Sequence, residues 1–256
     1  MEKIMNGPLP YVGGKSKLSK TIVEMMPEHL SYVEVFAGGL WVFFKKDESK
    51  YEIINDLDSD LITFYRVIQN HLEEFMRQYK YQLASREIFE DFKNQMDGRG
   101  LTDIQRAARY YYLQRICFGG KVKNRTFGTS VEKYPRINFM HLGEELTAVH
   151  LRLSRTTIEN LDWPLCIEKY DKEQTFFYLD PPYLTKPAYK HNFGVTDFER
   201  MAEVLKGIKG RFILSVNDHE SLIPLFSQFN IEQVSLSYSV SRSKSTTGKE
   251  LLIKNF

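Results

Sequence analysis

The stretch "FFYLDPPYLTKP", residues 176–187, ends an apolar run with a carboxylate and two prolines. Its first four residues predict a buried strand, and Asp180 lies where that strand leaves the sheet. Pro181 and Pro182 stiffen the backbone and lack N–H groups, so its carbonyl oxygens remain free as acceptors. The Asp180 carboxylate and the Pro181 carbonyl can then hold both hydrogens of one amino group, and Tyr183 offers a flat face to a base. Without a cofactor site on the same sheet edge, a rigid turn would be the better interpretation.

A glycine turn earlier in the chain indicates such a cofactor site. In "VFAGGL", residues 35–40, Gly38 and Gly39 follow a predicted strand and let the backbone approach a ligand at its carboxyl end. The next predicted strand ends at Asp56, 18 residues after Gly38, where a carboxylate can accept from both hydroxyls of a ribose. This pairing indicates a cofactor that contains adenosine. If the three strands are parallel, Gly38, Asp56 and Asp180 lie on one edge.

The sequence "GGKS", residues 13–16, suggests a phosphate-binding loop, but the pattern fails twice. Position 9 holds Leu where the pattern requires glycine, and no strand is predicted before it. What remains is a glycine turn that leads into a helix, with Ser16 as its predicted N-cap and Lys15 beside it. Such a turn suits a carboxylate or phosphate, and a plain turn explains it equally well.

The order of predicted elements indicates an α/β fold interrupted by helices. Residues 1–57 and 156–256 show strand and helix patterns in alternation, whereas residues 58–155 show apolar residues at helical spacing. We therefore predict one α/β domain formed by the two outer segments and a helical domain inserted between them.

Local signals add detail to this outline. Thr102 with Gln105, and Thr196 with Glu199, form predicted capping boxes at helix starts. A short apolar helix is predicted after the glycine turn, and another helix over 219–229. The last two predicted strands are expected to pair antiparallel at a sheet edge.

Positive charge is concentrated in the predicted helical segment. The whole chain has a net charge of +2, but residues 105–136 hold eight basic residues and one acid, which leaves −5 for the rest. Aromatic residues and the Gly119-Gly120 turn alternate with these charges, as suits a polyanion partner. A solvated helix face is the alternative. The side chains that could contact such a partner are Arg115, Lys121, Lys123, Asn124, Arg125 and Arg136.

A second candidate surface for a polyanion is the polar tract "SVSRSKSTTGK", residues 239–249, with Arg242 and Lys244. An ordinary solvated hairpin loop is the alternative there.

Composition limits the class of protein. Two distant cysteines, Cys117 and Cys166, argue for a reducing compartment and against a structural metal site. The longest apolar run covers 10 residues, 35–44, and the N-terminal residues lack a signal-peptide core. We therefore expect a soluble, cytoplasmic protein without a metal or a membrane partner.

Several motifs together resemble a known family over nearly the whole chain. "DPPY" after "FFYL", "PYVGGKSKL", "EVFAGG", "INDLD" and "FILSVND" are similar to motifs of the amino-methylating DNA methyltransferases that use S-adenosylmethionine. Their order resembles that of the alpha group (D12 class), which includes the Dam-type adenine methylases. The family often has a third glycine after the Phe-Ala-Gly-Gly turn, and here Leu40 and Trp41 follow instead.

The resemblance implies a Rossmann-like S-adenosylmethionine-dependent methyltransferase sheet with an inserted helical DNA-recognition domain. It implies that Tyr11 and Lys15 contact the methionine part of the cofactor, and that Asp56 holds the ribose. The glycine turn passes beneath the cofactor, and its residues are Phe36, Ala37, Gly38 and Gly39. The residues implied for catalysis are Asp180, Pro181, Pro182 and Tyr183. Of these, Asp180 and Pro181 would bind the exocyclic amine of a flipped adenine in double-stranded DNA, Tyr183 would stack on its ring, and Asp180 also borders the cofactor.

Three alternatives remain open at this point. The amine-holding geometry also suits cytosine, whose exocyclic amine is chemically similar. Leu40 suggests a DNA-binding relative with weakened catalysis. A phosphate-loop ATPase is the fourth and weakest hypothesis. We expect a monomer in each case.

Overall fold

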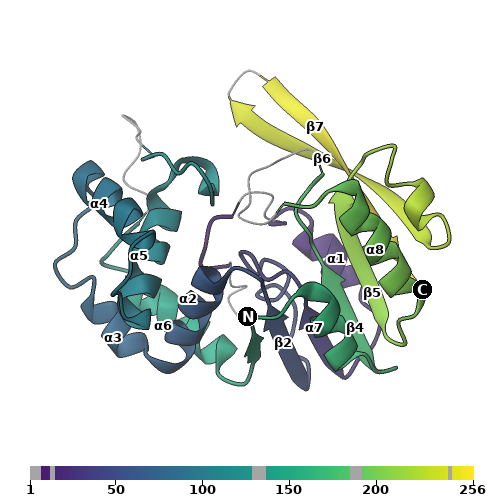
Figure 1. Ribbon diagram of the computed structural model, residues 1–256, viewed down its shortest axis with the longest axis horizontal. Helices are drawn as coiled ribbons and strands as arrows, with labels where there is room; N and C mark the ends of the chain where they lie inside the picture. The colour runs from purple at the N-terminus through teal and green to yellow at the C-terminus, as the bar shows by residue number, and fades with distance from the viewer. Residues whose placement is uncertain (1–6, 12–14, 129–136, 185–191, 242–243) are drawn as a thin grey trace.

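The computed structural model describes residues 7–11, 15–128, 137–184, 192–241 and 244–256. Seven strands form one sheet in the order β3-β2-β1-β4-β5-β7-β6 (Figure 1). The strands are β1 (Ser31–Glu34), β2 (Tyr51–Asn55), β3 (Thr157–Glu159), β4 (Thr175–Leu179), β5 (Arg211–Asn217), β6 (Asn230–Ser241) and β7 (Lys244–Lys254).

The strands from β3 to β5 are parallel. β1 pairs in parallel with both β2 and β4, β2 with β3, and β4 with β5. The chain order reverses between β1 and β4, which creates a crevice beyond the carboxyl ends of these strands. The three strands β1, β2 and β4 are thus parallel, which is the condition under which Gly38, Asp56 and Asp180 share one edge. We call the edge at which β1, β2 and β4 end the carboxyl edge.

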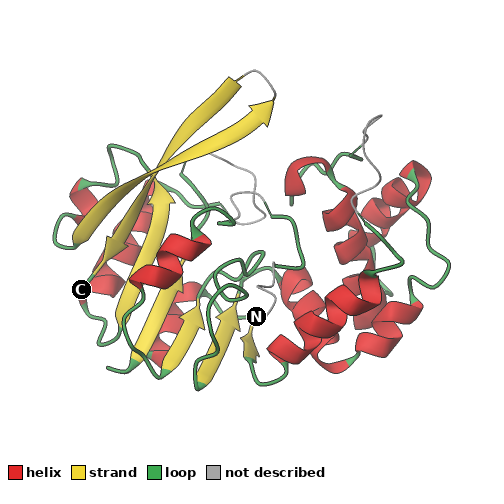
Figure 2. Cartoon of the chain, turned by 180° about the vertical axis from the view of Figure 1, so that it is seen from behind, coloured by secondary structure: helices red, strands yellow, loops and turns green. Residues whose placement is uncertain are grey.

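The two faces of the sheet contact different helices because alternate side chains of a strand point to opposite sides. Phe177 and Leu179 of β4 pack in a cluster with residues of α7 (Trp163–Tyr170) and α8 (Val195–Lys206). Phe176 and Tyr178 belong to the cluster that includes α1 (Ser19–Met25) and the inserted helices. The sheet thus lies between helices on both sides, as Figure 2 shows from behind.

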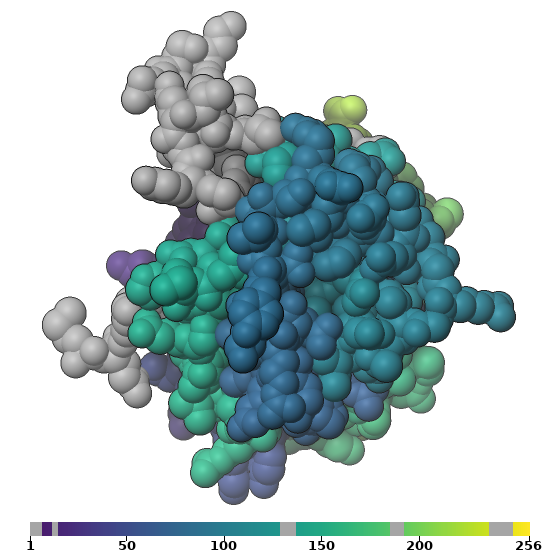
Figure 3. Space-filling model, turned by 90° about the vertical axis from the view of Figure 1, so that its left-hand side faces the viewer, coloured from purple at the N-terminus to yellow at the C-terminus, as the bar shows by residue number. Residues whose placement is uncertain are grey.

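The inserted helices form a compact unit beside β2 and β3. They are α2 (Ser59–Asn70), α3 (Leu72–Arg77), α4 (Arg86–Met96), α5 (Asp103–Ile116) and α6 (Leu142–Leu153). This unit forms the face of the molecule that Figure 3 presents. Aromatic rings fill its core, where Phe64 of α2 stacks on Tyr111 of α5 with ring centroids 5.3 Å apart. The Thr102–Gln105 capping box at the start of α5 is confirmed.

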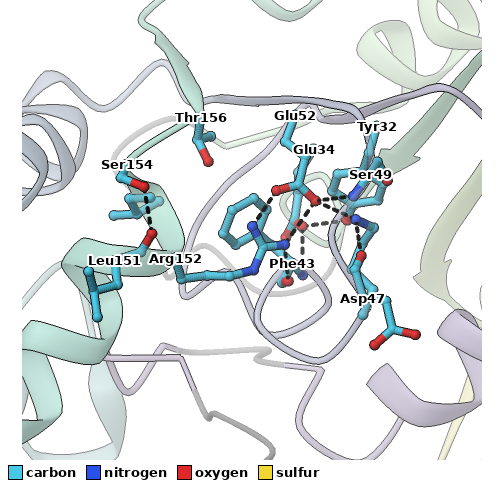
Figure 4. A network of polar contacts seen from close by, with 12 residues as sticks. Tyr32, Glu34, Phe43, Asp47, Ser49, Glu52, Leu151, Arg152, Ser154 and Thr156 are labelled. Atoms are coloured by element: carbon cyan, nitrogen blue, oxygen red, sulfur yellow. Dashed lines mark hydrogen bonds and ion pairs between the residues drawn. The ribbon is translucent and has the colours of Figure 1, made fainter. Parts of the chain in front are cut away.

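A buried ion pair ties the helical unit to the sheet. The guanidinium of Arg152 on α6 binds both carboxylate oxygens of Glu52 on β2, with 2.8 Å between Nη2 and Oε1. Its Cζ lies 3.9 Å from the centre of the Phe43 ring, and Nη2 also donates to the Phe43 carbonyl (Figure 4). Lys46 binds the same Glu52 carboxylate. The cost of burying Glu52 is thus offset by two cations, which hold α6 against β2.

Some local predictions were wrong. α1 begins at Ser19 rather than after Ser16, whose carbonyl instead accepts from the Ser19 hydroxyl. α8 begins at Val195, and Asp197 accepts from the Gly194 N–H, so Thr196 and Glu199 do not form its cap. The helix thus begins before the position at which the predicted box would cap it.

Other differences concern whole elements. Residues 40–46 form hydrogen-bonded turns rather than a helix. The helix predicted over 219–229 is reduced to the 3-10 turn η2 (Pro224–Phe226), because Pro224 has no N–H and restricts the residue before it. Helix α7 was not predicted. β6 and β7 pair antiparallel as predicted, but they continue far beyond β5, so most of the tract 239–249 belongs to strands.

Candidate active site

Three strand ends meet at the carboxyl edge, as the sequence predicts. The glycine turn follows β1, Asp56 follows β2, and Asp180 follows β4. Parallel pairing in register brings the ends of these neighbouring strands to one side of the sheet. A single cavity there is bordered by Gly38, Asp56 and Asp180.

The glycine turn is held by groups from two other elements. Gly38 adopts a φ of +45°, and its N–H donates to Asp56 Oδ2 at 3.1 Å. The Tyr65 hydroxyl on α2 donates to the Gly38 carbonyl at 2.7 Å. Asp56 is half-buried, and its partial removal from water raises its pKa to about 6 although backbone N–H groups of Asp58 and Gly38 oppose the shift. Backbone N–H groups of Gly38, Leu57 and Asp58 donate to the Asp56 carboxylate, whose two oxygens have about four lone-pair sites and so retain acceptor capacity for a ligand.

Leu40 explains how the turn forms without a third glycine. Its φ is +53°, a left-handed conformation that glycine adopts more easily than other residues. Its N–H donates to the Ala37 carbonyl at 2.8 Å, and its side chain is buried in the core. Burial of the leucine side chain therefore compensates for the strained backbone, and the turn keeps its shape.

The cavity brings together every residue that the resemblance implies for cofactor binding. These lining residues are Tyr11, Lys15, Phe36, Ala37, Gly38, Gly39, Asp56 and Asp180. Residues that sequence reasoning missed also line it, among them Glu34, Trp41, Asp58, Trp163 and Phe193. The indole Nε1 of Trp41 is buried and has no hydrogen-bond partner among the described residues. Trp41 belongs to no recognisable sequence motif. Its place beside the cavity depends on the backbone turn at Leu40, which only the structure shows.

A buried cluster of charged groups surrounds Asp180. The Lys15 ammonium lies 2.7 Å from Asp180 Oδ1 and 3.4 Å from Glu250 Oε2. The Ser215 hydroxyl donates to the same Asp180 oxygen at 3.2 Å. Burial raises the pKa of Asp180 to about 6, and the nearby Lys15 charge limits the rise. Glu250, at the point where β7 meets the end of β5, was missed because an acid in a strand of a hairpin has no motif of its own.

The remaining residues of the proline motif lie around this cluster. Pro182 lines the cavity, and Pro181 is buried. The Tyr183 hydroxyl donates to Glu250 Oε1 at 2.7 Å and accepts from Lys15, whose ammonium lies 4.5 Å from the ring centre. Burial, together with the two nearby carboxylates, raises the pKa of Tyr183 far above its usual value, so the phenol is neutral.

Glu34 is a buried carboxyl group at the end of β1. The Tyr32 hydroxyl donates to Oε2 at 2.5 Å, and the Phe43 N–H donates to the same oxygen at 3.1 Å (Figure 4). Burial raises its pKa to about 8, although both hydrogen bonds and Lys46 oppose the shift. Glu34 is therefore mostly protonated at neutral pH. A charged residue inside the otherwise apolar stretch "SYVEVF" was the signal that could have revealed it.

This raised pKa predicts a measurable effect on stability. The unfolded chain releases the Glu34 proton near its ordinary pKa of 4.5, and the folded chain releases it near pH 8. The native state therefore binds more protons between these values, so the free energy of unfolding falls as pH rises from about 4.5 to 8. We expect Glu34→Gln to make this fall shallower, by up to about 1.4 kcal/mol per pH unit. Urea unfolding of both proteins at pH 5.5, 6.5 and 7.5 measures the two slopes, and equal slopes would contradict the assignment.

The basic loop, residues 118–126, projects from the end of α5. Its ends are joined by an isolated antiparallel β-bridge between the backbones of Cys117 and Phe127. The Phe118 N–H also donates to the Thr126 carbonyl at 2.9 Å. Lys121 and Lys123 are exposed, and so is Asn124, which turns the chain with a φ of +49°. The predicted hairpin or long loop is therefore a closed loop with two lysines at its surface.

Other predicted DNA-binding residues have different surroundings. Arg115 pairs with Glu145 at 2.7 Å, and Arg125 donates to the Gln114 side chain at 3.2 Å. Both guanidinium groups therefore already bind groups of the protein. Lys244 begins β7, and Arg136 and Arg242 lie outside the described residues.

Neither a metal site nor a membrane-spanning helix occurs in the described part of the chain. Within the ranges given above, no group of three or more His, Cys, Asp or Glu side chains is arranged to hold a metal ion. None of the helices described is long and apolar enough to cross a membrane.

Comparisons with known proteins agree with this geometry. Residues 11–240 match the model of the D12 class N6 adenine-specific DNA methyltransferases, and the chain belongs to this family. It is 28% identical to the type II methyltransferase M1.LlaDCHI of Lactococcus lactis subsp. cremoris, over 96% of this chain and 94% of the relative. It is 25% identical to the type II methyltransferase M.CviBI of Paramecium bursaria Chlorella virus NC1A, over 96% and 98%. It is 22% identical to the DNA adenine methylase of Escherichia coli (strain K12), over 94% and 91%.

The predicted fold and activity are thus confirmed. The α/β fold class is confirmed by the seven-stranded sheet with helices on both faces, and the chain is an adenine-specific DNA methyltransferase. Membership of this family implies that S-adenosylmethionine is the methyl donor. Nothing in these comparisons favours the cytosine alternative.

Proposed function

We propose that this enzyme methylates an adenine that is flipped out of double-stranded DNA, and that the Asp180 corner holds its exocyclic amine. The observation that carries the proposal is the 2.7 Å contact between Asp180 Oδ1 and the Lys15 amino nitrogen at the border of the cavity. A carboxylate that accepts a hydrogen bond from one amino group at this place can accept one from another. The amine of the target base would take the position that the lysine ammonium holds here.

The cavity residues fit S-adenosylmethionine. The unpartnered Trp41 Nε1 can donate to a carboxylate, and the free lone pairs of Asp56 can accept from a ribose. The ring of Phe36 and the backbone of Gly38 and Gly39 provide the flat, close surface that an adenosine needs. When bound, S-adenosylmethionine supplies an electrophilic methyl group. Asp56, the glycine turn and Tyr11 would hold it, and Asp180 would border it.

The chain's own groups would position the adenine amine. The Asp180 carboxylate and the Pro181 carbonyl would accept its two hydrogens, which directs the nitrogen lone pair toward the methyl donor. Pro182 would keep this corner rigid, and Tyr183 would lie against the flipped ring. The adenine amine can reach Asp180 only if the Lys15 ammonium shifts toward Glu250. The Glu250 carboxylate already lies 3.4 Å from this ammonium.

Base flipping can be tested without turnover. A duplex with 2-aminopurine in place of the target adenine should become more fluorescent when the enzyme binds, because the base leaves its stack. The duplex carries the sequence found methylated in cells that express this chain. A second duplex with 2-aminopurine at a neighbouring position is the control and should change little. No change at the target position would contradict flipping.

The basic loop, residues 118–126, is the surface that we propose contacts DNA. Lys121 and Lys123 are exposed on it, and the exposed aromatic ring of Phe118 lies next to them in sequence. The ribbon formed by β6 and β7 leaves the sheet beyond the Asn217–Glu250 pair, so it projects from the carboxyl edge and would meet the same duplex. In this arrangement DNA lies across the carboxyl edge.

Replacing both lysines of the loop should weaken binding to every duplex. We expect Lys121→Ala/Lys123→Ala to lower the slope of log Kd against log salt by about one unit for each phosphate that the protein no longer neutralises, hence by about two. Fluorescence anisotropy at several salt concentrations gives this slope. The matched control is Lys172→Ala/Lys209→Ala, which removes two lysines beside the starts of β4 and β5, at the opposite edge of the sheet. A slope equal to that of the unaltered enzyme would place the DNA surface elsewhere.

A further inference from the structure

Gln114 is a buried amide at the end of α5 that connects two loops. Its side chain is fully buried. Its Nε2 donates to the Pro10 carbonyl and to the Gly120 carbonyl, each at 2.7 Å. Its Oε1 accepts from Arg125 Nη2 at 3.2 Å. Both N–H groups of the amide are thus used, one for each loop.

The first loop is the N-terminal segment, residues 7–11, which leads into the cofactor cavity. The carbonyl that Gln114 binds belongs to Pro10, and the next residue, Tyr11, lines the cavity. The Tyr11 ring also supports the glycine turn, because a Cβ atom on Gly38 would lie 3.3 Å from Tyr11 Cδ1. In Figure 1 this segment runs between α5 and the sheet. A shift of Pro10 would therefore move the wall of the cofactor cavity.

The second loop is the basic loop. Gln114 binds it at both ends, through the Gly120 carbonyl and through Arg125. Gly120 also packs directly on the N-terminal segment, since a Cβ atom there would lie 2.9 Å from the carbonyl of Pro10. With a φ of +65°, Gly120 has a backbone conformation that further favours glycine. The two loops therefore touch at one point, and the Gln114 amide holds them together there.

We propose that Gln114 is a positioning residue that couples cofactor binding to DNA binding. The inference rests on the proposed function, in which the cavity holds the cofactor and the basic loop holds DNA. A ligand that orders either loop lowers the entropy lost when the other loop becomes ordered, but only if the loops are linked. Such coupling is reciprocal, so DNA tightens cofactor binding by the same factor by which the cofactor tightens DNA binding.

The test measures this factor by binding rather than by turnover. Calorimetry gives the Kd of S-adenosylhomocysteine with and without a duplex that carries the sequence methylated in cells, and anisotropy gives the reverse pair. We expect a coupling factor of about 5- to 150-fold in the unaltered enzyme. In Gln114→Met, which keeps the length of the side chain but not its amide, the factor should fall below about 2-fold.

A matched control exists on α2. Gln69 also donates to two carbonyls, those of Leu153 and Thr156, at 2.7 and 2.8 Å. It links α2 to the end of α6 and the residues that follow rather than to either loop, so Gln69→Met should weaken the fold and leave the coupling factor unchanged. If Gln114→Met does not fold, Gln114→Asn replaces it, because its shorter amide cannot reach both carbonyls.

The outcomes separate the two proposals. If the unaltered enzyme binds neither S-adenosylhomocysteine nor the duplex, the proposed function fails. If both bind but do not affect each other, or if the Gln114 variants keep the full coupling factor, the role of Gln114 is wrong and the proposed function stands. A loss of coupling in Gln69→Met as well would show a general effect of stability and would also overturn the inference.

Discussion

Asp180→Ala should lower the rate of methyl transfer by about 10³-fold or more, since it removes the acceptor that positions the adenine amine. Duplex binding should remain nearly unchanged, because Asp180 lies at the cavity rather than on the basic loop. Lys15 keeps the Glu250 carboxylate and the Tyr183 hydroxyl as partners in the variant, so the buried ammonium is not left alone. Single-turnover transfer of a labelled methyl group and anisotropy with the same duplex measure the two quantities.

A matched control for this substitution lies at the other end of β4. Asp171 precedes the strand and accepts hydrogen bonds from the backbone N–H groups of Lys209 and Gly210. Asp171→Ala should therefore reduce stability and leave the rate within about 2-fold once the protein is folded, as a structural turn remote from the chemistry would. Transfer by Asp180→Ala at a rate close to that of the unaltered enzyme would refute the role of the carboxylate.

The pKa of Asp180 adds a dependence on pH. The group must be ionised to accept the amine hydrogens, and its pKa is about 6. The rate should therefore rise through pH 6 and level off above pH 7. Asp56 has a similar pKa and contributes to the same acid limb if its carboxylate holds the cofactor.

Lys15→Met has the second large expected effect, because Lys15 neutralises a buried acidic cluster. The variant leaves Asp180 and Glu250 without their shared cation, and breaking such a buried arrangement costs about 3–5 kcal/mol. The acid limb of the rate should also move to higher pH, because the Lys15 charge lowers the pKa of Asp180. Urea unfolding at pH 7.5 and the pH profile of single turnover measure these two changes.

A double variant separates charge from packing. Lys15→Met/Glu250→Gln removes one of the two carboxylates, so it should recover part of the lost unfolding free energy. If packing alone were responsible, the second substitution would bring no recovery. A variant Lys15→Met as stable as the unaltered enzyme would show that the cluster does not depend on its cation.

The strands and the order of the motifs could be predicted from the sequence. Apolar runs such as residues 176–179 predict strands because a parallel strand is buried on both faces. Gly38, Asp56 and Asp180 each follow such a run, so parallel pairing alone places them on one edge. The cofactor-binding and catalytic roles of these residues remain predictions, whereas the family and its activity are confirmed.

Segments whose local sequence only weakly favours one type of secondary structure were predicted less well. The residues 219–229 have the apolar spacing of a helix, yet Pro224 interrupts its hydrogen bonds. α7 begins with Trp163 and Pro164, and is only eight residues long, so its periodicity is too short to recognise. Tertiary packing rather than local sequence decides such segments.

The sequence by itself determined the sheet, the inserted helices and the three strand ends that meet at the carboxyl edge, because burial and backbone chemistry act on near neighbours along the chain. Only the tertiary structure decided which distant groups surround Asp180 and which amide joins the two loops. Lys15, Asp180 and Glu250 are far apart in the chain, and so are Pro10 and Gln114. Contacts of this kind leave no periodic pattern, since they depend on how whole elements pack against one another.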